Sequence, residues 1–341
     1  MNGHQRIAAA LLGEWPDKVP VMLHNFMPAA REAGLTQAQF REHPDLAAKA
    51  FIQAVEKYDL DGILVDLDTA TLAGAVGVPV EFPVDSPAVC NGGCLSTLEA
   101  VRDLVPVDLS TYRYVRHWLE VVRQLRSYFD SEVFVRGNCD QAPFALACAM
   151  RTPADLMMDL CDPDAEELIT RLLEYCTGVS SQFICLMAQT GAHMVSNGDS
   201  PAGPAMISPA MYAKYALPAE KAVIAAAHAQ GLPYALHICG DTALILEPMA
   251  RTGTDAVEID YKTDLTAAHA VLKDSITFIG NIDPSGVIAR GTAGTVRAAV
   301  KIVLDKFADT PRFILNAGCA IPPTAPEENI RAMVETARAF R

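Results

Sequence analysis

The chain carries eight short apolar runs, and segments with a helical repeat of apolar and polar residues separate them. Consecutive apolar residues are typical of parallel strands that are buried on both faces. The eight predicted strands lie near residues 19–24, 61–66, 133–138, 192–197, 234–239, 256–260, 277–283 and 313–318. Strands that alternate with helices pair in parallel, and eight of them close into a barrel. We therefore predict a single α/β domain over residues 1–341, a (β/α)8 TIM barrel.

An open doubly wound sheet is the alternative fold. It is disfavoured because no Gly-rich dinucleotide fingerprint follows any of the predicted strands. Apolar periodicity predicts helices at 5–12, 36–57, 98–103, 112–129, 142–150, 155–160, 164–189, 208–230, 242–252, 265–272, 292–307 and from 326 onward. We expect Pro44 and Pro209 each to begin a helix at its first position, and Pro218 to interrupt the helical segment that contains it. Residues 74–100 are rich in glycine and proline and predict a loop excursion, a flap at the barrel mouth.

Composition narrows the class of protein. Half of the chain is hydrophobic (51%), which is enough for a large core, and the net charge is −14. That charge, without any lysine or arginine cluster, argues against a nucleic-acid partner. No segment is long and apolar enough to predict a membrane span, and residues 1–6 lack the pattern of a signal peptide. The nine cysteines follow no disulfide spacing, so we expect a cytoplasmic protein with reduced thiols.

Each predicted strand is followed by polar or ionisable side chains. These are His24 and Asn25, Asp66 and Asp68, Arg136 and Asn138, Asn197 and Asp199, His237 and Cys239, Glu258 and Asp260, Asn281 and Asp283, and Asn316 and Cys319. TIM barrels place their active sites at these carboxyl ends of the strands. Some of the residues are expected to be helix caps and loop anchors, so they form a pool of candidates.

Three of these candidates suit a metal ion. His237 and Cys239 are two residues apart at the end of one strand, so their side chains face the same way. Cys319 follows the last strand, in a turn that contains Gly318. One imidazole and two thiolates give a tetrahedral zinc ion three protein ligands and leave one position open. Two thiolates also balance the charge of the ion, which suits the binding and deprotonation of an incoming thiol. The alternative is a buried core histidine with two small apolar cysteines.

Several stretches resemble the uroporphyrinogen decarboxylase superfamily. They are residues 134–150, 156–163 and 199–218, and, most specifically, 237–240, 280–284 and 316–329. Within that superfamily the chain is similar to zinc-dependent corrinoid methyltransferases, which move a methyl group from a methylated corrinoid protein to a thiol such as coenzyme M. The resemblance implies that His237, Cys239 and Cys319 are the zinc ligands. It also implies a separate corrinoid-binding partner, since no Asp-x-His-x-x-Gly cobalamin motif occurs in this chain.

Two features count against the decarboxylase branch. The arginine-rich substrate motif of the decarboxylases is missing from residues 21–28, where Arg31 is the nearest arginine, and Cys319 stands where the decarboxylases have histidine. Three alternatives remain open: a methyltransferase that methylates a corrinoid protein from a donor such as a methoxyaromatic compound, a cofactor-free decarboxylase, and a non-catalytic corrinoid carrier.

The remaining candidates receive provisional roles. Asp199 is a candidate catalytic acid that orients the substrate, with a loop anchor as the alternative, and Glu258 is a candidate fourth zinc ligand. Arg136 is expected to hold an anionic group of the acceptor or to form a structural ion pair. Asn281 and Asp283 are expected to bind ligands or to shape the turn that follows them. Two further residue sets are less specific: Asp241 is expected to cap the helix at 242–252, and Cys90 with Cys94 is a weak candidate for a second metal or redox pair.

Overall fold

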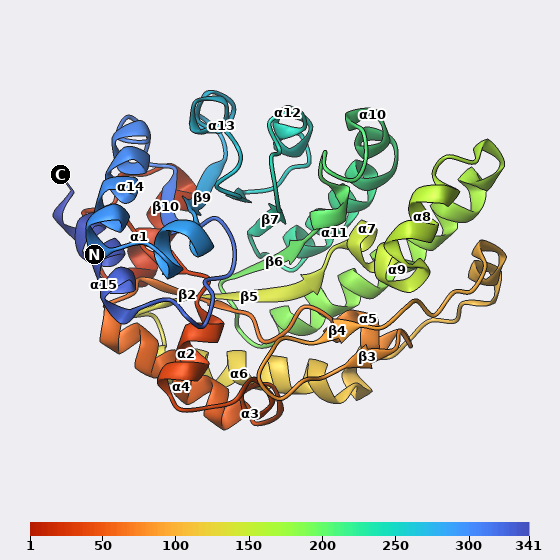
Figure 1. Cartoon of the computed structure of the whole chain (residues 1–341), viewed down its shortest axis with the longest axis horizontal. Coiled ribbons are helices and arrows are strands. Elements are labelled where there is room, and N and C mark those ends of the chain that lie inside the picture. Colours follow the sequence, from red (N-terminus) through yellow and green to blue (C-terminus); the bar gives the residue numbers. More distant parts are fainter. Residues whose placement is uncertain (341) are drawn as a thin grey trace.

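Eight parallel strands form the centre of the protein in a computed structural model, which describes residues 1–340 (Figure 1). In their order around the sheet these are β1 (Met22–Leu23), β2 (Gly62–Val65), β5 (Phe134–Gln141), β6 (Met194–Gly198), β7 (Tyr234–Ile238), β8 (Ala256–Ile259), β9 (Thr277–Ile282) and β10 (Phe313–Ala317). The sheet closes where Val21 forms a parallel bridge with Leu315, whose amide donates to the carbonyl oxygen of Pro20 at 2.9 Å. The predicted TIM barrel is confirmed, with all eight strands near their expected places.

Helices surround this barrel, and both chain ends lie at the left of the view in Figure 1. They are α1 (Gly3–Leu12), α2 (Phe26–Glu32), α3 (Gln37–Glu42), α4 (Pro44–Tyr58), α5 (Thr71–Ala75), α6 (Arg113–Phe129), α7 (Pro143–Arg151), α8 (Pro153–Asp159), α9 (Glu166–Ala188), α10 (Pro209–Met211), α11 (Leu217–Ala229), α12 (Leu246–Ala250), α13 (Leu265–Leu272), α14 (Ala293–Lys306) and α15 (Glu327–Ala339). Pro44 begins α4 and Pro209 begins α10, as predicted. Pro218 does not break its segment, because a π-helical turn at Tyr212–Ala216 joins α10 to α11 and Pro218 stands in the first turn of α11.

Several boundaries differ from the prediction. Strand β1 has two residues instead of six, and the amide of Val21 donates to the carboxylate of Asp61 at 2.7 Å rather than to a neighbouring strand. The expected helix 242–252 shrinks to α12, so Asp241 is not its N-cap: its carboxylate accepts from the amide of Ala243 at 3.0 Å in a local turn. Helices α2 and α5 were not predicted. The excursion at 74–100 contains a small antiparallel hairpin of β3 (Val80–Glu81) and β4 (Val89–Cys90).

An apolar plug fills the amino-terminal end of the barrel. Its members come from α1 and from seven strands: Ile7, Ala10, Met22, Phe134, Met194, Ala235, Ala256, Ile279 and Ile314. Burial of each large side chain contributes roughly 1.5–3 kcal/mol. The eighth strand contributes Gly62, where a Cβ atom would lie 2.5 Å from Cδ1 of Ile7, so α1 approaches this strand closely. The plug leaves only the carboxyl ends of the strands available for a site.

The next inward layer of the barrel is polar. Side chains two residues apart on a strand share a face, so the positions after the plug also point inward. They include His24 on the β1 side, Arg136 in β5, His237 in β7 and Glu258 in β8, and all four are buried. Two residues beyond the plug, the inward-facing side chains of these strands therefore change from apolar to polar.

Candidate metal centre

A cavity of about 280 Å³ lies at the carboxyl ends of the strands. Its polar lining is His24, Asp66, Asp68, Thr69, Arg136, Asn138, Asp140, Gln141, Asn197, Ser200, His237, Cys239, Glu258 and Cys319. The excursion at 74–100 reaches it through Pro87. The cavity therefore lies where the strand-end residues predicted a site.

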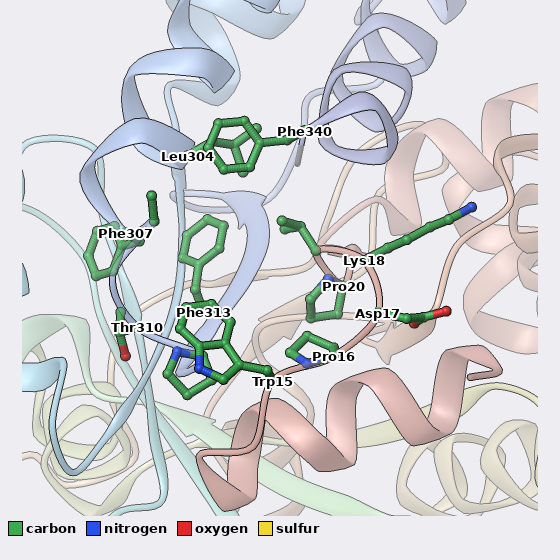
Figure 2. A pocket seen from close by; sticks show the side chains of 13 residues that line it. Trp15, Pro16, Asp17, Lys18, Pro20, Leu304, Phe307, Thr310, Phe313 and Phe340 are labelled. Atoms are coloured by element: carbon green, nitrogen blue, oxygen red, sulfur yellow. The ribbon is translucent and has the colours of Figure 1, made fainter.

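A second hollow, of about 170 Å³, lies at the opposite end of the barrel (Figure 2). The rings of Trp15, Phe307, Phe313 and Phe340 surround it. Its carboxylate, Asp17, pairs with Arg6 at 2.7 Å. Within residues 1–340, only His237, Cys239 and Cys319 form a cluster that could hold a metal, so the apolar hollow is no candidate for metal chemistry.

The three predicted metal ligands meet in the cavity at the barrel mouth. His237 lies in β7, Cys239 follows the same strand, and Cys319 follows β10. Nε2 of His237 lies 3.0 Å from Sγ of Cys239, which lies 3.7 Å from Sγ of Cys319. Sulfur ligands of tetrahedral zinc, each about 2.3 Å from the metal, lie about 3.8 Å apart. The two sulfurs are therefore already at the separation that one zinc ion requires, and both cysteines are free of disulfides.

Glu258 orients the imidazole through its main chain. Nδ1 of His237 lies 2.9 Å from the carbonyl oxygen of Glu258 and donates its proton to that oxygen. This bond leaves Nε2 as the ring nitrogen that faces the sulfurs, which is the arrangement that histidine ligands of zinc adopt. The donor set and its orientation therefore fit a zinc ion held by His237, Cys239 and Cys319.

The three ligands share their protons unequally in the absence of a metal. The hydrogen bond from Cys319, together with His237, lowers the pKa of Cys239 to about 3 in spite of burial. Burial alone would lower the pKa of His237, but the charge and hydrogen bond of Cys239 raise it to about 10. The pKa of Cys319 is raised by its bond to Cys239 and by burial. The site thus holds one thiolate between an imidazolium and a thiol.

A charged network lies beside the ligands. Nη1 of Arg136 lies 2.5 Å from Oε2 of Glu258, and Nε donates to Oγ of Ser196 at 2.9 Å. Nε2 of His24 lies 2.8 Å from Oδ2 of Asp66, and its Nδ1 lies 3.5 Å from Oε1 of Glu258. Burial would lower the pKa of His24, but bonds to Asp66 and Glu258 raise it to about 9. Burial opposes ionisation of Glu258, yet Arg136 and His24 hold its pKa well below the usual range.

These contacts bear on the roles considered for Arg136 and Glu258. Arg136 forms the structural ion pair that was its alternative role. The carboxylate of Glu258 is directed to Arg136, and its Oε1 lies 3.9 Å from Nδ1 of His237, the ring nitrogen that faces away from the sulfurs. Glu258 therefore lies next to the ligand group without being a member of it.

Three other predicted site residues lie outside the lining of the cavity. Asp199 is fully buried, and its Oδ1 accepts from the amide of Ala145 at 2.6 Å, at the start of α7. This contact is consistent with the loop anchor considered as its alternative role. Nδ2 of Asn281 donates to the carbonyl oxygen of Asp260 at 3.3 Å. Asp283 caps the turn that follows β9, accepting from the amides of Ser285 and Gly286 at 2.9 and 2.8 Å.

Among the lining residues that the sequence missed or left without a role, two are carboxylates of particular interest. Asp66 was only one of the pool, yet its pairing with His24 places it at the centre of the lining. Asp140 was missed because β5 was expected to end at residue 138, whereas it continues to Gln141 with a register shift against β6. The polar sequence after Gly137 was the available signal. Cys90 and Cys94, the suggested second centre, are both free of disulfides and belong to no group of three or more metal-ligating side chains within residues 1–340.

Comparison with known proteins identifies the family. The model of the family named uroporphyrinogen decarboxylase (URO-D) matches residues 2–340. The methylcobamide:CoM methyltransferase MtbA of Methanosarcina mazei is 34% identical over 176 residues, a match that spans 52% of this chain and 50% of that protein. A uroporphyrinogen decarboxylase of Syntrophotalea carbinolica is 30% identical over 299 residues, which cover 86% of this chain and 83% of the relative.

The solved structure of a methyltransferase from Methanosarcina mazei superposes with a TM-score of 0.91. The match covers 100% of this chain and 99% of that one at 22% sequence identity, and it supports the fold. No helix in residues 1–340 combines the length and the apolar character needed to cross a membrane. The match of the family model over nearly the whole sequence establishes that the chain belongs to the uroporphyrinogen decarboxylase (URO-D) family.

Proposed function

We propose that this protein is a zinc-dependent methyltransferase that moves a methyl group between a methylated corrinoid and a thiol acceptor such as coenzyme M. The observation that carries the proposal is the cluster of His237, Cys239 and Cys319, whose donor atoms lie within 4.8 Å of one another in the cavity. Similarity to the methylcobamide:CoM methyltransferase MtbA of Methanosarcina mazei supports it over half of the chain.

Different residues of the chain would have different roles in the reaction. A zinc ion on His237, Cys239 and Cys319 would supply Lewis acidity, which lowers the pKa of a thiol. The carbonyl oxygen of Glu258 holds the imidazole in place. In the reaction, the acceptor would attack as a thiolate after losing its proton to solvent, and its sulfur would bond to the methyl carbon as the cobalt–carbon bond breaks and leaves both of its electrons with the corrinoid. A cavity of about 280 Å³ would orient a small acceptor for this attack.

The corrinoid would arrive on a partner protein. The loops that follow β6, β7 and β8 surround the mouth and carry the exposed side chains Met206, Leu244 and Tyr261, which are 44%, 71% and 41% exposed. Apolar side chains at the rim of a cavity favour contact with another protein. The acidic net charge of −14 does not oppose a partner with a basic surface.

Decarboxylation of a tetrapyrrole is the second candidate function, because the decarboxylase of Syntrophotalea carbinolica is similar over most of the chain. A tetrapyrrole carries several carboxylates that require cations. In this cavity Arg136 is already paired with Glu258, and no arginine lies within residues 21–28. The cavity of about 280 Å³ is also at the small end of ligand sites. Both observations favour a smaller substrate.

Metal content and chelation test the proposal. Protein purified without chelator is expected to hold about one zinc ion per chain, and Cys319→Ser is expected to lose it. Cys161→Ser, at an exposed cysteine, is the matched control and should retain the metal. Transfer from methylcobalamin to a small thiol, followed by corrinoid absorbance, should stop after chelation and return with zinc. A zinc-free wild type, or decarboxylase activity that survives chelation, would refute the proposal.

A further inference from the structure

Every cation that faces the cavity is paired with a carboxylate, although Nδ1 of His24 is buried without a hydrogen-bond partner. Arg136 contacts Glu258 at 2.5 Å, and His24 contacts Asp66 at 2.8 Å. The remaining side chain of the lining that can carry a positive charge is His237, a proposed zinc ligand. Within residues 1–340 no lysine belongs to the lining. The cavity thus offers no uncompensated positive charge.

Arg41 lies behind this lining and is also fully engaged. Its Nε pairs with Asp68, Nη1 donates to the carbonyl oxygen of Pro83 at 3.4 Å, and Nη2 donates to that of Ser86 at 3.0 Å. The side chain is 2% exposed. Arg41 therefore neutralises Asp68 and is not available to an anionic ligand in the cavity.

The lining holds four carboxyl groups, of which Asp68 is neutralised by Arg41, and burial raises the pKa of Asp140 well above its usual value. They are Asp66, Asp68, Asp140 and Glu258. Asp66 has an oxygen to spare: Oδ2 bonds to His24, whereas Oδ1 is buried without a hydrogen-bond partner, and the side chain is 4% exposed. A buried acceptor without a donor is costly. A ligand that presents a donor to this oxygen would remove that cost.

Zinc would not change the charge balance. Two thiolates cancel the charge of the ion and the imidazole is neutral, so the centre adds no positive charge to the wall. A buried anion requires a compensating cation or strong donors. An N–H group of Arg136 without a partner could donate to a neutral oxygen as readily as to an anion, because Glu258 already balances the charge of the guanidinium group.

We infer that the acceptor is a small neutral or cationic thiol whose hydroxyl or ammonium group donates to Oδ1 of Asp66, rather than an anionic thiol such as coenzyme M. This inference rests on the proposed function and names the substrate class of the same site. Asp66 would be the residue that determines specificity, since it holds a buried acceptor atom without a partner in the lining.

A matched series of thiols tests this inference. Cysteamine, 2-mercaptoethanol, 3-mercaptopropionate and coenzyme M are titrated into the zinc-loaded protein by calorimetry. We expect cysteamine and 2-mercaptoethanol to bind at least about tenfold more tightly than coenzyme M. The thiols differ in their own acidity, so the ratio is compared with that in Asp66→Asn, where this difference cancels. The preference for cysteamine over coenzyme M should fall at least about fivefold in the variant. Asp274→Asn, at an exposed position outside the cavity, should keep the wild-type ratio.

The outcomes separate this inference from the proposed function. Coenzyme M that binds as tightly as cysteamine, or a preference that is unchanged in Asp66→Asn, overturns the inference even if methyl transfer occurs. A preserved preference without methyl transfer to any thiol refutes the proposed reaction alone. Failure of all four thiols to bind overturns both. If Asp66→Asn does not fold, as judged by circular dichroism, Asp66→Ser takes its place in the comparison with the wild type.

Discussion

The main-chain carbonyl oxygen of Glu258 lies 2.9 Å from Nδ1 of His237, while the side chain of the same residue lies 2.5 Å from Nη1 of Arg136. One residue therefore orients a proposed zinc ligand with its backbone and balances a buried arginine with its carboxylate. The two tasks can be separated by mutation, because a substitution of the side chain keeps the carbonyl group.

Glu258→Gln should destabilise the protein without removing its zinc. The substitution leaves Arg136 buried without a carboxylate, and loss of one member of a buried ion pair costs about 3–5 kcal/mol. Denaturant unfolding measures this cost, with Asp305→Asn on exposed helix α14 as the control. Zinc content measured on the folded variant should equal that of the wild type. A folded variant without zinc would instead show that Glu258 is a metal ligand.

Cys239 should react selectively in the zinc-free protein. The hydrogen bond from Cys319 and the charge of His237 lower the pKa of Cys239 to about 3, and the thiolate is the reactive form. At pH 6, iodoacetamide should therefore modify Cys239 before the exposed Cys161, as mass spectrometry of the peptides would show. Zinc should protect Cys239, and His237→Gln should slow its modification. Faster reaction at Cys161 would contradict the unequal sharing of protons.

The stability contributed by His24 should disappear in mildly alkaline solution. Asp66 and Glu258 raise its pKa in the folded protein to about 9 against the effect of burial, whereas an unfolded histidine titrates near about 6.5. A pKa that is raised on folding stabilises the protein fully below the lower value, and this contribution is lost as the pH rises through the higher one. The difference amounts to about 3 kcal/mol.

The unfolding free energy of the wild type, relative to that of His24→Gln, should therefore fall between about pH 6.5 and pH 9. Urea titrations at four pH values in this window measure it. The variant serves as the reference because it shares the other ionisable groups of the chain. A difference that stays constant across the window would mean that His24 is not protonated in the folded protein.

Gly62→Ala should destabilise the plug. The added Cβ atom would lie 2.5 Å from Cδ1 of Ile7, and overpacking of a core costs about 1–3 kcal/mol. Ile7→Val removes that methyl group, so the double variant should recover part of the loss, and a double-mutant cycle gives the coupling. Zinc content should not change, since the plug and the ligands are separate layers. Additive effects of the two substitutions would contradict the contact.

The sequence predicted best the features that depend on a regular repeat, either of buried strands along the chain or of side chains along one strand. Eight buried runs predicted the barrel, and the spacing of two residues placed His237 and Cys239 on one face, next to Cys319. Their role as zinc ligands stays a proposal. The acids at the strand ends were harder, because a carboxylate that caps a turn and one that lines a cavity follow the same strand. Asp283 caps a turn and Asp66 lines the cavity, and only the geometry of the loops distinguishes the two roles.

Ion pairs across the barrel could not be predicted from spacing either. Arg136 and Glu258 are 122 positions apart, and their contact depends on the register of strands β5 to β8 around the barrel. From the sequence, Arg136 could have bound an anionic ligand or formed an ion pair, and in the fold its charge is balanced by Glu258.

The plug at the amino-terminal end of the barrel has a kinetic consequence. Ile7 and Ala10 of α1 close that end together with residues from seven strands, so the proposed acceptor and corrinoid protein would have to use one entrance. In the proposed reaction a docked partner covers that entrance, and the acceptor therefore has to enter first. The methylated product leaves only after the partner has dissociated. Steady-state kinetics should accordingly follow a compulsory order, with the small substrate first on and its product last off.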